Sequence, residues 1–193
     1  VQSVALRKES PAARTRYVLK LDFVGANPQV QLRGEETTEA VVSYFTGPQD
    51  QWRANLPTYS KIVYANLWPG IDLVYSGTNS RLKYAFVVQP GADPAQIRLA
   101  YGGSTGLTLT DGGQLEIGTP VGDLRDEKPY SYQEQDGHQQ AVRTTYHLHP
   151  AASGTVQEYG FQIGSYDRNH PLIIDPAVIV YSGFIGGSSH DEG

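Results

Sequence analysis

Apolar and polar residues alternate along most of this chain, and the repeat of three to four residues that marks an amphipathic helix is nearly absent. The segment RYVLKLDFV shows the alternation best: Tyr17, Leu19, Leu21 and Phe23 fall on one face of an extended strand. This pattern predicts a strand with one buried face. Similar runs follow at 40–45, 71–77, 81–88, 96–103, 106–118, 128–150, 155–166 and 171–184.

Turn-forming residues separate these runs. Asp111-Gly112-Gly113 and Asp136-Gly137 each lie between two alternating segments, and glycine supplies the positive φ of a tight hairpin turn. Residues 78–80 predict a third turn of this kind. The best helical candidate is a single turn at 93–96, where Asp93 caps the start and Pro94 takes the first helical position.

About a dozen short strands with frequent turns are typical of a sandwich or a barrel-like all-β fold. We therefore predict an antiparallel, β-sandwich-like domain over residues 1–176 with almost no helix. It forms either one unit or two packed subdomains, with a break near 102–106. Residues 177–193 are interpreted as an exit strand followed by the truncated start of another module.

Composition excludes several classes of function. The net charge of −5 is spread without long basic runs, which argues against a nucleic-acid partner. The chain has no cysteine, so disulfides, thiolate zinc sites and cysteine nucleophiles are excluded. No apolar stretch approaches the roughly 18 residues that a membrane-spanning helix needs.

Candidate metal ligands are sparse, and we expect no cofactor. His147 and His149 in YHLHP lie two residues apart on a predicted strand, so both imidazoles face one side, but no third ligand is identifiable by spacing. Asp191 and Glu192 supply few of the six to eight oxygens that Ca²⁺ prefers. The favoured interpretation of all four is a solvated surface role, with a Ca²⁺ site in the tail as the alternative.

Candidate catalytic groups are equally weak, and we predict that the chain is not an enzyme. Ser104 in GGSTG lacks the strand–turn–helix context of a nucleophile elbow. Carboxylates are plentiful, but structural roles are favoured over the paired acids of a glycosidase. Asp93 is expected to be a cap, and Asp72 and Asp175 are expected to pair with Lys61, Arg81, Lys83 or Arg168. The set comprises Asp72, Asp93, Asp123, Asp126, Asp167 and Asp175.

Aromatic residues cluster between positions 52 and 75. If they are buried, they form the core of a sheet, and this interpretation is favoured. If they are exposed, Trp52, Tyr59 and Trp68 would make a platform for a carbohydrate or a protein.

Several long motifs occur in one order: YFTGPQDQWRANLPTYSKIVYANLWPGIDLVYSG (44–77), LKYAFVVQPGADPAQIRLAYGG (82–103), KPYSYQE (128–134), GSYDRNHPLIIDP (164–176) and VYSGFIGGSSHDEG (180–193). From about residue 17 to the C-terminus the chain resembles the conserved domain of unknown function that precedes SBBP repeats, which are seven-bladed β-propeller-like, in large exported bacterial proteins. The resemblance implies that 181–188 is the entry strand and turn of a first repeat. The pattern often carries two adjacent acidic residues after the glycines; here His190 is inserted before Asp191 and Glu192, which puts an inherited metal role in doubt.

The resemblance and the strand pattern together predict a non-enzymatic structural or adhesive module of a bacterial cell-surface or secreted protein. Its expected partner is a protein or a larger assembly that pairs with an open β-edge, with Val178, Val180, Phe184 and Ile185 as candidate contacts. Carbohydrate binding through the aromatic cluster is the first alternative, and hydrolysis is the second.

Overall fold

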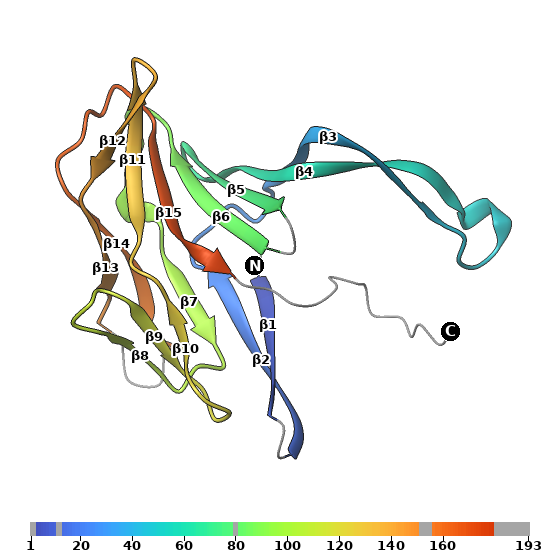
Figure 1. The fold of residues 1–193 in the computed structure, drawn as a ribbon, viewed down its shortest axis with the longest axis horizontal. Coiled ribbons are helices and arrows are strands. Elements are labelled where there is room, and N and C mark those ends of the chain that lie inside the picture. The colour runs from blue at the N-terminus through green and yellow to red at the C-terminus, as the bar shows by residue number, and fades with distance from the viewer. Residues whose placement is uncertain (1–2, 11–12, 79–80, 151–155, 180–193) are drawn as a thin grey trace.

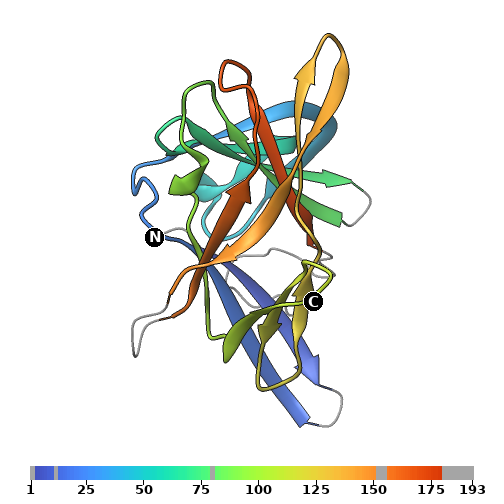
Figure 2. The ribbon, with the colours of Figure 1, turned by 90° about the vertical axis from the view of Figure 1, so that its left-hand side faces the viewer.

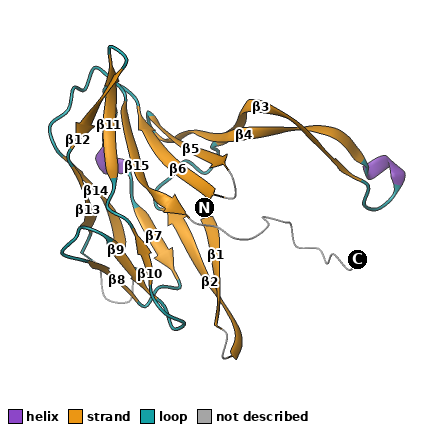
Figure 3. Ribbon diagram, in the orientation of Figure 1, coloured by secondary structure: helices purple, strands orange, loops and turns teal. Residues whose placement is uncertain are grey.

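The structure is a computed structural model that describes residues 3–10, 13–78, 81–150 and 156–179. It is all-β, with three antiparallel sheets that do not close into a barrel, as predicted (Figure 1, Figure 3). Two short 3₁₀ helices interrupt the strands, η1 (Gln49–Gln51) and η2 (Pro94–Gln96). None of the helices in the described part of the chain is long and apolar enough to cross a membrane.

The largest sheet has seven strands in the order β12-β11-β15-β6-β5-β4-β3. Their bounds are β3 (Gln31–Tyr44), β4 (Arg53–Trp68), β5 (Ile71–Thr78), β6 (Arg81–Val88), β11 (Tyr130–Gln135), β12 (His138–Val142) and β15 (Leu172–Ile179).

A second sheet has five strands in the order β1-β2-β7-β14-β13, and a third has three in the order β10-β9-β8. Their bounds are β1 (Ser3–Ser10), β2 (Ala13–Phe23), β7 (Leu99–Gly102), β8 (Gly106–Leu109), β9 (Leu115–Gly118), β10 (Leu124–Asp126), β13 (Thr144–Leu148) and β14 (Glu158–Ile163). Figure 2 shows the three-stranded sheet and the β1–β2 hairpin at the same end of the molecule.

One apolar core joins the sheets. The alternation in β2 has the predicted effect, because Leu19, Leu21 and Phe23 are buried. They pack in the same cluster as residues from the seven-stranded and three-stranded sheets, including Phe86 and Leu115. Residues 103–105, where a break was expected, are the connection from β7 in one sheet to β8 in another, and both strands contribute to this common core.

The predicted turns are present where they can be described, whereas residues 79–80 of the third expected turn lie outside the described ranges. β11 and β12 pair up to Gln135 and His138, and the intervening Asp136 and Gly137 both have positive φ, 51° and 76°. These values fit a two-residue hairpin turn that only glycine and a few polar residues adopt without strain. At η2 the Asp93 carboxylate accepts the Ala95 N–H at 3.0 Å, which confirms the predicted cap.

The feature that the alternation did not predict is a long arm. Beyond the body of the seven-stranded sheet, β3 and β4 continue as a two-stranded ribbon that ends in η1 (Figure 1). All residues of β3 are exposed. Among the described residues no third strand pairs with the outer part of this ribbon, so the arm projects from the body as a two-stranded hairpin.

Candidate interaction site on the β3–β4 arm

The arm is held together by backbone pairing with bulges. β3 and β4 pair from Gln31 with Ala65 to Tyr44 with Arg53, and the register shifts near Thr37 and again near Val42. Glu36 and Asn55 have positive φ, 55° and 57°. Bulges increase the local twist of a ribbon and discourage pairing with stray strands.

Polar side chains reinforce the pairing midway along the arm. Lys61 Nζ lies 2.6 Å from the Glu36 carboxylate, which also accepts a hydrogen bond from the Ser60 hydroxyl at 2.7 Å. The hydrogen bond from Lys61 is the largest cause of a lowered pKa of Glu36, and the hydrogen bond from Ser60 is the second. The hydroxyls of Thr38 and Thr58 hydrogen bond to each other. These exposed contacts order the arm more than they stabilise the protein.

Tyr59 covers Gly34 on the opposite strand of the arm. A Cβ at position 34 would overlap the ring of Tyr59. This arrangement is the aromatic cover of a strand glycine, in which a cross-strand ring shields backbone that a side chain would otherwise cover. Tyr59 is therefore a structural element of the arm, although it is exposed on its other side.

The outer end of the arm carries a group of exposed apolar side chains. Phe45 and Trp52 meet edge to face across the tip, with ring centroids 5.2 Å apart. The Trp52 indole N–H donates to the Gly47 carbonyl at 3.2 Å, which fixes the ring. We call the following residues the tip patch: Val41, Val42, Tyr44, Phe45 and Trp52, all of them exposed.

The aromatic candidates from the sequence divide between surface and core. Trp52 is 41% exposed and lies at the tip of the arm, and Tyr59 is exposed farther along it. Trp68 is only 2% exposed; it packs against Phe23 and Phe86 and donates its N–H to the Val24 carbonyl at 3.1 Å. Trp68 is therefore part of the core, and its ring is not available for stacking on a ligand.

The exit-strand candidates are only partly placed. Val178 lies in β15 and pairs with Lys83 of β6, so this part of the strand has a neighbour inside the sheet. Val180, Phe184 and Ile185 lie outside the described residues, as do Asp191 and Glu192.

His147 and His149 lie side by side, as the spacing predicted, with ring centroids 5.0 Å apart. His149 is partly buried; this burial, together with Arg98 and His147, lowers its pKa. Arg98 forms an ion pair with Glu158 at 2.6 Å. Within the described ranges, no group of three or more His, Cys, Asp or Glu side chains is arranged to hold a metal ion.

Several carboxylates and Ser104 have structural partners. The Asp72 carboxylate accepts the Asn66 N–H at 2.7 Å and the Gln89 amide at 3.4 Å, so amides hold it where we expected Lys or Arg. Asp167 accepts hydrogen bonds from the Asn169 amide groups. The Ser104 hydroxyl donates to the Tyr101 carbonyl at 2.8 Å in a turn between two strands.

A buried polar group lies between two sheets. The hydroxyl of Tyr101, on β7, donates to the Asp126 carboxylate of β10 at 2.8 Å. Burial raises the pKa of Asp126, and the bond from Tyr101 opposes that effect. The Tyr101 ring stacks on that of Tyr159, with centroids 5.7 Å apart. This arrangement joins the two sheets.

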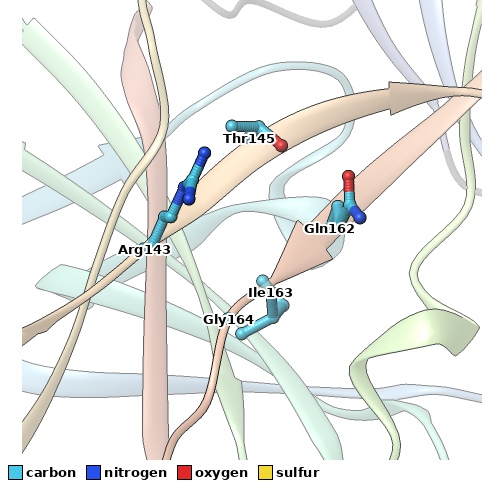
Figure 4. A pocket seen from close by; sticks show the side chains of 5 residues that line it. All are labelled: Arg143, Thr145, Gln162, Ile163 and Gly164. Carbon is cyan, nitrogen blue, oxygen red and sulfur yellow. The ribbon is translucent and has the colours of Figure 1, made fainter.

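A small cleft of about 250 Å³ opens beside the ends of β13 and β14 (Figure 4). Arg143, Thr145 and Gln162 supply its polar groups, and Ile163 and Gly164 complete its lining. Thr145 and Gln162 are direct cross-strand partners. A guanidinium beside a hydroxyl and an amide has the chemistry to bind a small anion, but the cleft contributes no acid or base for a reaction.

The arm and its tip patch are therefore the candidate interaction surface. The sequence signal for this surface was the group of aromatic and aliphatic residues at 41–45, together with Trp52 among polar neighbours. No curated protein and no solved structure matches the chain. A known family does match it, over residues 2–177, which include the arm, the core and β15 through Ala177. The chain therefore belongs to the family defined by a domain of unknown function, DUF7948.

Proposed function

We propose that this domain is a non-enzymatic structural or adhesive module that binds a protein partner through the tip of the β3–β4 arm. The observation that carries this proposal is the tip patch: Tyr44 and Phe45 are 60% and 62% exposed at the end of an ordered projection. Groups of exposed large apolar residues on a protein surface mark sites that bind proteins, membranes or ligands.

The composition and order of the tip patch support a protein partner. Tyr, Trp and Phe are enriched at the centres of protein interfaces, where they fill pockets on the partner. The Trp52–Gly47 hydrogen bond and the Phe45–Trp52 contact hold two of these rings before binding. A pre-ordered anchor loses less conformational entropy on association, so a small patch binds more tightly than a mobile loop would.

The proposed setting is a bacterial cell-surface or secreted protein in which this domain precedes a propeller-like repeat array. This part of the proposal rests on the resemblance of the segment YSGFIGGS, 181–188, to the entry of an SBBP repeat. The function of the domain would then be to assemble or present the array.

The test uses a photo-crosslinking amino acid in the full-length protein in its native cells. We expect that the crosslinker at Phe45 gives one dominant protein adduct, identified by mass spectrometry. The matched control places it at Tyr130, which is similarly exposed on the body of the domain. Adducts at Phe45 that are no more abundant or defined than those at Tyr130 would contradict the proposal.

Carbohydrate binding is the second candidate, because Trp52 is exposed beside the polar residues Gln51 and Arg53. The chain has two tryptophans, so Trp68→Phe leaves Trp52 as the single tryptophan reporter. A polysaccharide that stacks on Trp52 would shift the fluorescence emission of this variant in a saturable titration. The same titration of Trp52→Phe, which reports from the buried Trp68, should then show no shift.

A further inference from the structure

The core-facing side of the seven-stranded sheet continues onto β4 and β3, where it is no longer covered. Leu73 pairs with Tyr64, which pairs with Leu32, and Tyr75 pairs with Ile62. Residues in one row of a sheet face the same side, so all five share the side of the core. Exposure rises outward along this side, from 0% at Leu73 and 8% at Tyr75 to 43% at Ile62 and 55% at Leu32.

We call Leu32, Ile62, Tyr64 and Tyr75 the shoulder face, because they lie where the arm leaves the body. It is distinct from the tip patch. The rings of Tyr64 and Tyr75 meet edge to face with centroids 5.8 Å apart, and they form the inner wall of this face.

The uncovered part of the shoulder face is apolar. Leu32 and Ile62 are its two most exposed residues. An extended segment laid across this face would bring an apolar side chain to both of them.

β15 ends at the end of the seven-stranded sheet where the shoulder face lies. Its last pair joins Ile179 to Leu82, and Leu82 pairs with Gly77, two residues beyond Tyr75 on β5. β4 leaves the body past the same end, beyond Lys61. At about 4.8 Å per strand, β4 and β3 lie roughly 14–19 Å across the sheet from β15, a distance that five or six extended residues span.

The sequence that follows Ile179, the last residue of β15, has the composition and the length that this crossing requires. Val180 and Tyr181 come first, and Phe184 and Ile185 are the fifth and sixth residues after the strand. Adjacent side chains of an extended chain point to opposite sides, so such a chain would bring one of these two, Phe184, onto the shoulder face at the level of β4 and β3.

We propose that the shoulder face is the docking site for residues 180–185 of this same chain. The segment crosses the open side of β4 and β3, where the Phe184 side chain covers Ile62 and Leu32. The base of the arm then holds the exit of the chain in one orientation relative to the domain. This proposal does not depend on a partner at the tip patch.

The absence of cysteine from the chain allows a clean disulfide test in the full-length protein. Ile62→Cys with Phe184→Cys places one thiol on the shoulder face and one on the segment. The matched control is Lys61→Cys with Phe184→Cys, because residue 61 is adjacent on β4 and faces the other side of the sheet. A disulfide forms only where the Cα atoms approach within about 7 Å and the Cβ atoms face each other.

We expect an intramolecular disulfide in the Ile62 pair at about ten times the yield of the Lys61 pair, since only the first meets that geometry. Equal yields in the two pairs would overturn the proposal. A disulfide between two molecules, lost on dilution, would also overturn it and would assign the shoulder face to a second copy. Independently, Phe184→Ser with Ile185→Ser should speed amide hydrogen exchange at 61–64, and an unchanged exchange rate there would contradict the docking.

Discussion

The side chain of Gln133 joins β11 to a loop more than 30 residues away in the sequence. It is 3% exposed on β11, and its amide nitrogen donates to the carbonyls of Asp167 at 2.8 Å and His170 at 3.1 Å. Its amide oxygen accepts the Asp167 N–H at 2.9 Å. One side chain therefore satisfies several backbone groups of the loop before β15, which orders that loop against the sheet.

Gln133→Leu should lower the free energy of unfolding by about 1–3 kcal/mol, because it leaves these partly buried backbone groups without partners. Chemical denaturation followed by circular dichroism measures the change. Gln139→Leu is the control, because Gln139 is exposed on β12. In the structure its side-chain amide lies 3.5 Å from the Glu134 carboxylate, which is a weak contact. Equal effects of the two substitutions would show that the network around Gln133 contributes little.

Asp126 makes stability depend on pH in a defined direction. Burial raises its pKa in the folded protein above the ordinary value of 3.8, so folding favours the protonated acid. The stabilising contribution is complete below that value and is lost as the pH rises through the folded pKa. Asp126→Asn stays neutral at every pH, and its amide oxygen still accepts the Tyr101 hydroxyl.

The stability of Asp126→Asn relative to the unchanged protein should therefore rise between pH 3 and pH 7. Urea denaturation at a series of pH values gives this difference directly. Asp50→Asn on the arm removes the same charge from an exposed position and serves as the control. A difference that stays constant with pH for Asp126→Asn would show that this carboxyl does not oppose folding when it is ionised.

At the scale of whole elements, the sequence predicted strands that bury one face, such as β2, and missed most of the β3–β4 ribbon. β2 was recognisable because Leu19, Leu21 and Phe23 alternate with polar residues. The first part of β3 reads QLRGEETTE and shows no such alternation, because every residue there is exposed. Alternation reports burial, and a ribbon in solvent is stabilised by pairing and bulges instead.

Because alternation reports only burial, it also could not locate the candidate interaction site. Trp52 and Trp68 are indistinguishable by residue type, and only their positions relative to the body decide that one is exposed and the other buried. The exposed arm, and hence the tip patch and the shoulder face, follows from the cross-strand register. Long-range pairing of this kind is not encoded in any local pattern.

The arm should be dispensable for folding. Residues 36–60 contain no buried side chain, and Glu35 pairs directly with Lys61. Replacing 36–60 by Asn-Gly leaves these two residues as the ends of a two-residue hairpin. We expect the free energy of unfolding to change by less than about 1 kcal/mol, because single surface substitutions usually change it by no more than about 0.5 kcal/mol. A loss of stability well above this range would show that the arm supports the core.

At the scale of the whole molecule, Trp68 tests whether the sheets unfold together. Its ring contacts Phe23 of β2 and Phe86 of β6, with centroids 6.1 Å and 5.9 Å away, so it reports contact between the five-stranded and seven-stranded sheets. The apolar cluster around it also includes Leu107 and Ile117 of the three-stranded sheet. A continuous core of this kind favours one cooperative transition over the separate unfolding of two subdomains.

In Trp52→Phe, where Trp68 is the remaining tryptophan, the unfolding curves from fluorescence and from far-ultraviolet circular dichroism should coincide. Trp68→Ala should shift the whole transition by about 3–5 kcal/mol, the usual cost of removing a large buried ring, and should not split it. Trp68→Phe keeps an aromatic ring in place and should cost less. Two separated transitions in Trp52→Phe would mean that the sheets on either side of 102–106 are independent units, because a single shared core cannot lose one sheet while the other keeps its native packing.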